Sequence, residues 1–122
     1  MPSLDIENLE SIDESQVSEL LNQPGGESSL YHRLHGIFIY EGPDLVSELR
    51  RLVQEGSRSE IHDVFHKIKG SSAAMGAKRI HALAAHAVQV CLEDGEPEML
   101  AELPDLIEAE YSRYSSEAQR FL

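Results

Sequence analysis

The chain has 122 residues and a mass of 13.6 kDa, which is the size of a single domain with one hydrophobic core. Lys and Arg total 10 and Asp and Glu total 22, so the formal net charge is −12. We therefore expect neither nucleic acid nor an anionic membrane as a partner, because both attract proteins through clustered cations.

The remaining composition indicates a soluble domain held together by packing. Hydrophobic residues make up 41% of the chain, and the single cysteine, Cys91, excludes an internal disulfide. No apolar run approaches the ~20 residues of a membrane span, and the stretch MPSLDIENLE lacks the basic and apolar regions of a signal peptide. We expect one cytoplasmic, monomeric domain over residues 1–122, with flexible residues 1–12 and a core over about 13–118.

Glycines and prolines separate segments with helical periodicity, and alternating strand patterns are almost absent. We predict a short helix over residues 14–22 and a second helix from about 28 to 40. A third helix begins at Pro43, which suits a first turn, and ends before Gly56. The apolar side chains that the pattern predicts to face the core are Val17, Leu20, Leu21, Leu30, Leu34, Ile37, Phe38, Leu45, Leu49, Leu52 and Val53.

The second half of the chain continues in the same way. A fourth helix runs from a serine cap at 57 or 59 to about Met75, where Gly76 stops it, and a fifth runs over residues 78–93. Pro97 opens a last helical stretch, which Pro104 kinks or restarts. Amphipathic helices with short links predict an all-α fold, an antiparallel up-down four-helix bundle with an additional short N-terminal helix.

The fourth helix carries the residues that indicate a function. At about 100° per residue, its core stripe consists of Ile61, Val64, Phe65, Ile68, Ser72 and Met75. His66 lies about 140° from the centre of that stripe and is therefore expected to face solvent. The residues that surround His66 on the helix surface are Ser59, His62, Lys69, Gly70 and Ala73.

Gly70 and Lys69 give this histidine an unusual setting. A glycine inside a helix costs about 1 kcal/mol relative to alanine, and Gly70 lies one turn after His66 on the same face. Its missing side chain leaves one flank of the imidazole open to a large partner. Lys69 can reach a group carried by the ring, and its charge favours the neutral, nucleophilic imidazole. The three residues fit a histidine that receives a phosphoryl group.

The stretch FHKIKGSSAAMGAKRI, residues 65–80, closely resembles the phosphoacceptor motif of histidine-containing phosphotransfer (HPt) domains, which reads His-x-x-Lys-Gly-Ser/Ala and is followed by a second Gly. The resemblance implies that His66 is the phosphorylated histidine and that Lys69 helps to neutralise the phosphoryl group. It also implies that Gly70 gives the partner access and that Gly76 ends the helix.

Domains of this kind are relay intermediates, which accept a phosphoryl group from an aspartyl phosphate on one receiver domain and pass it to an aspartate on another. The resemblance implies that the partners are receiver domains of a hybrid histidine kinase or a response regulator. It implies that Mg²⁺ belongs to the receiver, and that the chain is a phosphocarrier rather than an enzyme, with no cofactor or metal of its own. Gly25-Gly26 is not part of a nucleotide-binding loop, so self-phosphorylation from ATP is not expected.

The docking face for the receiver is expected around His66, at Ser59, His62 and Ala73. By analogy with the family, apolar residues of a neighbouring helix, such as Val17 and Leu21, are expected to border it.

Two other functions remain open at this point. The chain could be an adaptor that binds a receiver without taking phosphate, although the intact acceptor histidine argues against this. It could also be a metal-binding bundle, because His62 and His66 have the i, i+4 spacing of metal ligands. That site would need a third ligand, and Lys69 would oppose a cation. We interpret Cys91, Tyr111 and Tyr114 as buried packing residues.

Overall fold

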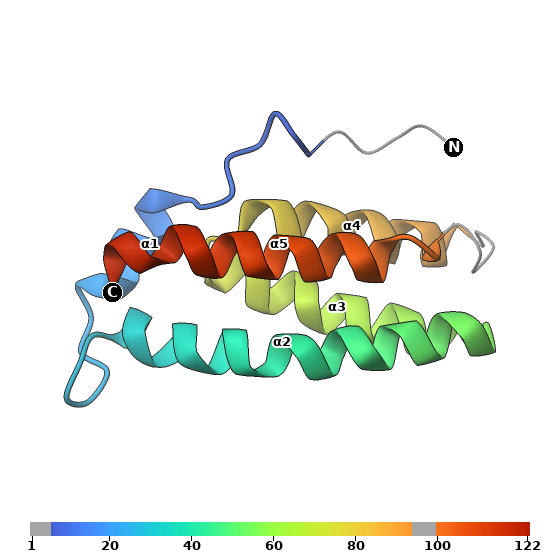
Figure 1. Cartoon of the computed structure of the whole chain (residues 1–122), viewed down its shortest axis with the longest axis horizontal. Coiled ribbons are helices and arrows are strands. Elements are labelled where there is room, and N and C mark those ends of the chain that lie inside the picture. Colours follow the sequence, from blue (N-terminus) through green and yellow to red (C-terminus); the bar gives the residue numbers. More distant parts are fainter. Residues whose placement is uncertain (1–5, 94–99) are drawn as a thin grey trace.

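The structure is a computed structural model that describes residues 6–93 and 100–122. Within these residues the regular elements are helices, which confirms the all-α prediction. They are α1 (Glu14–Leu21), α2 (Leu30–Glu55), α3 (Arg58–Ala74), α4 (Lys78–Leu92), α5 (Leu103–Ala118) and a short 3₁₀ helix η2 (Gln119–Phe121). Figure 1 shows α2, α3, α4 and α5 lying along the long axis of the molecule, with α1 at one end. Helix α3 packs on α2 and α4, and α5 packs on α4 and α2, so the four helices enclose one core.

The core stripe predicted for α3 is confirmed. Phe65, Ile61 and Ile68 have no exposed surface, and the polar Ser72 is equally buried. Ser72 tolerates this burial because its hydroxyl donates to the carbonyl of Ile68 at 2.6 Å. The buried positions predicted for Cys91, Tyr111 and Tyr114 are also confirmed.

Helix α2 is one continuous helix through Pro43, so the prediction of two helices here is wrong. Proline disfavours helical geometry in the preceding residue, partly through a clash with its Cβ, and Gly42 has no Cβ. The same glycine is buried against α5, since a Cβ at this position would lie 3.0 Å from Cδ1 of Tyr111. Gly42 therefore allows both the proline and the close approach of α5.

Continuity through Pro43 also sets which face of α2 is buried. The buried stripe runs in phase along the whole helix and consists of Tyr31, His35, Phe38, Gly42, Leu45, Val46, Leu49 and Leu52. Ile37, which we predicted in the core, is 48% exposed. Leu30, Leu34 and Val53 are only partly buried.

Gly76 ends α3 as predicted. It has φ of 65°, in the left-handed region, and the N–H of Ala77 donates to the carbonyl of Ser72 at 2.9 Å. This pattern is a Schellman motif, which turns the chain sharply into α4. At the other end of the bundle, Pro97 lies outside the described residues, and α5 begins at Leu103 with Pro104 in its first turn.

Residues 6–12 differ from the flexible segment that we expected. Ile12 is 3% exposed and Ser11 is 8% exposed, and both lie against the junction of α3 and α4. The N–H of Asp13 donates to the carbonyl of Gly76 at 2.8 Å. Backbone hydrogen bonds and buried apolar surface therefore hold this segment on the bundle.

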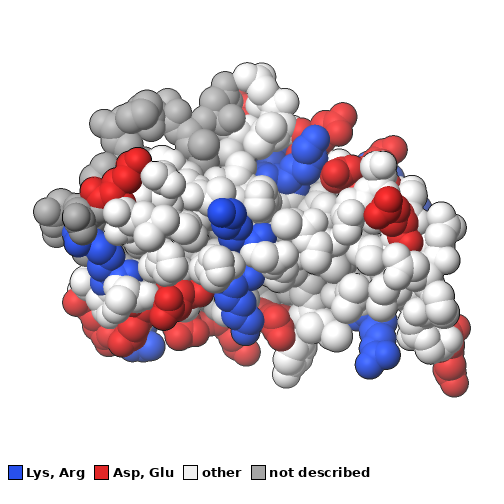
Figure 2. All heavy atoms as spheres, turned by 180° about the vertical axis from the view of Figure 1, so that it is seen from behind, with Lys and Arg blue, Asp and Glu red and all other residues white. Residues whose placement is uncertain are grey.

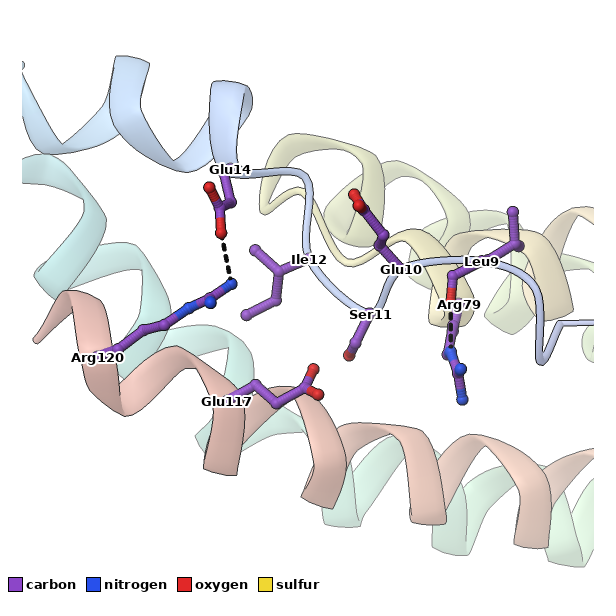
Figure 3. A pocket seen from close by; sticks show the side chains of 8 residues that line it. All are labelled: Leu9, Glu10, Ser11, Ile12, Glu14, Arg79, Glu117 and Arg120. Atoms are coloured by element: carbon purple, nitrogen blue, oxygen red, sulfur yellow. Dashed lines mark hydrogen bonds and ion pairs between the residues drawn. The ribbon is translucent and has the colours of Figure 1, made fainter.

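Arg79 of α4 holds the same segment through its side chain (Figure 3). Its Nε donates to the carbonyl oxygen of Leu9 at 2.9 Å. An ion pair of 2.8 Å between Arg120 and Glu14 links the end of the chain to the start of α1. These contacts line a hollow of about 400 Å³. The two arginines that border this hollow, Arg79 and Arg120, are thus both bound to other groups of the protein.

A polar chain crosses the aromatic core near the end of α3. The hydroxyl of Tyr114 donates to the carbonyl of Met75, and the hydroxyl of Tyr31 lies 2.7 Å from that of Tyr114. Since Tyr114 uses its proton on the carbonyl, Tyr31 donates to Tyr114. His35 packs against both rings, and its Nε2 has no hydrogen-bond partner among the described residues. Burial, and to a smaller degree the charge of His32, lowers the pKa of His35.

Candidate functional site

His66 stands on the outer ridge of α3. Its side chain is exposed, whereas its neighbours Phe65 and Ile68 are fully buried and anchor the helix. Among the described residues, no hydrogen bond or ion pair ties the His66 ring to another group. The imidazole is therefore presented on a rigid helix with its nitrogens accessible to a partner.

The flank of His66 at Gly70 is open. A Cβ built on Gly70 has no heavy atom within 4 Å outside its own helix turn, so no other helix approaches this glycine. The glycine is also exposed. Close packing within the molecule is thus excluded as the reason for a helix-weakening residue here. The structure leaves open space at this position, one turn after His66.

Lys69 lies one turn after His66 and is half-buried. Its backbone carbonyl accepts a hydrogen bond from Nδ1 of His81 at 3.1 Å, and it also lies 3.1 Å from the hydroxyl of Ser72, which shares its one proton with the carbonyl of Ile68. His81 belongs to α4, so the two helices are joined at this residue. The joint fixes the backbone from which the Lys69 side chain extends.

His62 lies one turn before His66 and stacks on it. The two ring centroids are 5.9 Å apart and the rings are within 7° of parallel. Nδ1 of His62 donates to Oδ1 of Asp63 at 3.2 Å, and the His62 side chain is 29% exposed. The structure thus places a second imidazole directly beside the candidate acceptor.

Two hollows lie at the ends of this face. Near the start of α3, a hollow of about 360 Å³ is bordered by Ser59, His62 and Leu92, and Leu92 is 64% exposed. Near the end of α3, a hollow of about 290 Å³ is bordered by Ala73 and His81. The predicted docking residues Ser59, His62 and Ala73 therefore share one side of α3 with His66. Leu92 and His81 also border these hollows. The sequence did not point to them, because they come from α4 and only the packing of the two helices brings them there.

Charge is distributed unevenly over the side of the molecule on which α3 and α4 lie. Figure 2 shows Lys and Arg side chains near the middle of this view and at several places along its margins, whereas acidic side chains lie mainly toward the margins. A chain of net charge −12 thus keeps cations at the centre of one face. Such an arrangement favours a partner that brings negative charge to that centre.

The apolar border predicted on the first helix is wrong for Val17. This side chain has no exposed surface, because it packs into the bundle core. Leu21 is half-buried against the same core. A partner at His66 therefore meets α3 and α4 without contacting Val17.

Within residues 6–93 and 100–122, no group of three or more His, Cys, Asp or Glu side chains is arranged to hold a metal ion. His62 and His66 are brought together there without a third ligand of these types. Among the described helices, none combines the length and hydropathy that crossing a bilayer requires.

A family model described as the Hpt domain matches residues 33–117, which contain α3, α4, His66 and most of α2 and α5. The chain belongs to the Hpt domain family. No curated protein and no solved structure is significantly similar to it. Membership in this family gives the Hpt domain a phosphotransfer role in two-component phosphorelays, where such domains are phosphocarriers that interact with receiver domains.

Proposed function

We propose that this Hpt domain carries a phosphoryl group on His66, accepted from an aspartyl phosphate of one receiver domain and passed to an aspartate of another. The observation that supports this most strongly is the combination of an exposed imidazole with open space over Gly70, inside the part of the chain that matches the family. An ordinary surface histidine needs no bare flank, whereas an in-line approach of a receiver does.

The transfer follows from the ring's chemistry. The lone pair of one imidazole nitrogen forms the N–P bond, and the P–O bond to the donor carboxylate breaks, so the carboxylate leaves with the electron pair. The proton on the other ring nitrogen can pass to solvent. The Lys69 ammonium then lies near the new dianion and favours it. Gly70 leaves room for the receiver, and Ser59, His62 and Ala73 form the docking face in this proposal.

The proposal includes several finer statements. We expect the receivers to belong to a hybrid histidine kinase, a response regulator or both, and to supply Mg²⁺, since phosphoryl transfer needs charge neutralisation that one lysine provides only in part. We propose a chain without autonomous kinase activity and without a cofactor of its own, acting as a monomer in the cytoplasm. We also propose that α2, α3, α4 and α5 form an antiparallel up-down bundle, in line with their arrangement in Figure 1.

The experiment is phosphotransfer from a panel of phosphorylated receivers, followed by a test for acid-labile, alkali-stable label on the protein. Wild type is expected to take up label and His66→Gln to take up none. The matched control is His32→Gln, which replaces another exposed histidine, near the start of α2, and should label normally. Equal labelling of wild type and His66→Gln would show that the site assignment is wrong.

A further inference from the structure

The His62 ring is held in a defined place beside His66. On one side it is fixed by the hydrogen bond from its Nδ1 to Asp63, and on another it borders the hollow that it shares with Leu92 of α4. Its plane lies within 7° of that of His66. Parallel rings with centroids 4.5–7 Å apart form a stabilising pair, so His62 restricts the orientations that the exposed His66 ring can adopt.

The groups around His62 decide what charge it can carry. From α3 it is faced by Arg58, Asp63 and His66, and from α4 by the thiol of Cys91, which borders the same hollow. Burial raises the pKa of Cys91, so the thiol contributes no charge near neutral pH. Unlike lysine or arginine, an imidazole changes its charge in the physiological range of pH.

Phosphorylation would change the charge of this neighbourhood. A phosphoryl group adds about −1.5 to −2 charges at pH 7. On the His66 ring it would lie between Lys69, one turn after, and His62, one turn before. A positive charge at about 6 Å in water-like surroundings favours an anion of one to two charges by about threefold to tenfold. The protonated form of His62 would thus stabilise the phosphorylated form of His66.

We propose that His62 is a positioning residue for the phosphoryl-transfer step, whose ring orients His66 and, when protonated, balances the charge of the phosphoryl group. This inference rests on the proposed function of His66. It makes the relay sensitive to pH, because protonation of His62 and phosphorylation of His66 promote each other to the same extent. The contribution of His62 therefore favours the phosphorylated domain more at pH 6 than at pH 8.

The experiment uses the full chain and phosphoramidate, a small-molecule donor whose P–N bond breaks with release of ammonia as the N–P bond to histidine forms. NMR of the ring C–H groups then follows the titration of His62 before and after phosphorylation. The expected result is that the midpoint of the His62 titration moves up by about 0.5 to 1 pH unit, the equivalent of threefold to tenfold. An unchanged midpoint in protein that is fully phosphorylated on His66 would overturn the proposal.

Variants separate the two roles of the ring. His62→Phe keeps an aromatic ring beside His66 but cannot be protonated. We expect the ratio of its labelling by phosphoramidate to that of wild type to fall threefold to tenfold between pH 8 and pH 6, whereas for the control His32→Phe this ratio should stay the same. A ratio for His62→Phe that does not change between pH 8 and pH 6 would refute the charge role. Absence of label on His66 in the wild type would instead refute the proposed function.

Discussion

Substitution of Gly70 should separate stability from transfer. The position is exposed, lies inside α3 and has open space where a side chain would begin, so alanine gains helix propensity without a steric cost. The expected gain in the free energy of unfolding is about 0.5–1 kcal/mol. With an unfolding entropy of about 2.1 cal/mol/K per residue, a gain of 1 kcal/mol raises the Tm of a 122-residue chain by about 4 °C. Gly70→Ala should therefore melt about 2–4 °C higher than wild type.

Transfer should move in the opposite direction. Gly70→Leu introduces a good helix former at this position, but its side chain projects into the space beside His66. A displacement of about 1 Å in a reacting complex can cost about 100-fold in rate, so we expect transfer from a phosphorylated receiver to slow by about tenfold to 100-fold. Gly70→Ala, with a single methyl group, should have a smaller effect. Rates come from the disappearance of receiver label in a rapid-mixing assay.

Gly36 provides the matched control. It is an exposed glycine inside α2, and a Cβ there would also meet no atom within 4 Å. Gly36→Leu should stabilise the fold as Gly70→Leu does, without slowing transfer. The access argument fails if a folded Gly70→Leu transfers as fast as wild type. The structural argument fails if Gly70→Ala lowers the Tm.

The other predictions concern the fold. Gly42→Ala should lower the free energy of unfolding by about 1–3 kcal/mol, measured in urea, because its Cβ would lie 3.0 Å from Cδ1 of the buried Tyr111; a neutral effect would contradict this close packing. Burial lowers the pKa of His35. As the pH falls, the imidazole of His35 is therefore protonated in the unfolded state at a higher pH than in the folded state. The contribution of His35 to the free energy of unfolding should be fully present above about pH 6.5 and fall below it. In urea titrations at pH 7 and 5, His35→Leu should lose less stability between the two pH values than wild type. An equal loss in both proteins would refute this account. Tyr114→Phe leaves a buried hydroxyl and a carbonyl unpaired and should cost about 1–3 kcal/mol, whereas Tyr31→Phe removes only one donor and should cost about 0.5–1.5 kcal/mol; the reverse order would show that the hydrogen-bond direction is wrong.

Helix α3 was predictable because all its evidence is local. A stripe repeating every three to four residues places Phe65 and Ile68 inward and His66 outward, whatever the rest of the molecule does. Gly76 has a specific role at a helix end, so it marked the boundary as well. The family resemblance rested on this same segment, and the Hpt match over residues 33–117 confirms it.

Helix α2 was harder to predict because its local signals conflict. Over residues 30–40, Leu30, Leu34 and Ile37 form one plausible apolar face, while Tyr31 and His35 form another. Only the continuation of the helix beyond residue 43, to the buried leucines of its second half, selects the second face. Proline at that point favoured a break, and the absence of a Cβ on the residue before it was the signal that could have corrected this reading.

The contacts of residues 6–12 could not be read from the sequence. The segment has apolar side chains, such as Ile6 and Ile12, but no helical or strand periodicity. Its partners, among them Arg79, lie about seventy residues away in the chain. Tertiary hydrogen bonds at this separation leave no pattern in one sequence, and the same is true of the contact that brings Leu92 to the acceptor face.

The link between His81 and the carbonyl of Lys69 affects how helix α3 can move. The peptide bond that follows this carbonyl leads into Gly70, where the backbone is freest to distort. Two side chains, one from the next turn and one from α4, fasten the helix at that bond. The access proposed at Gly70 thus need not disturb the orientation of His66, and each encounter with a receiver can begin from the same geometry.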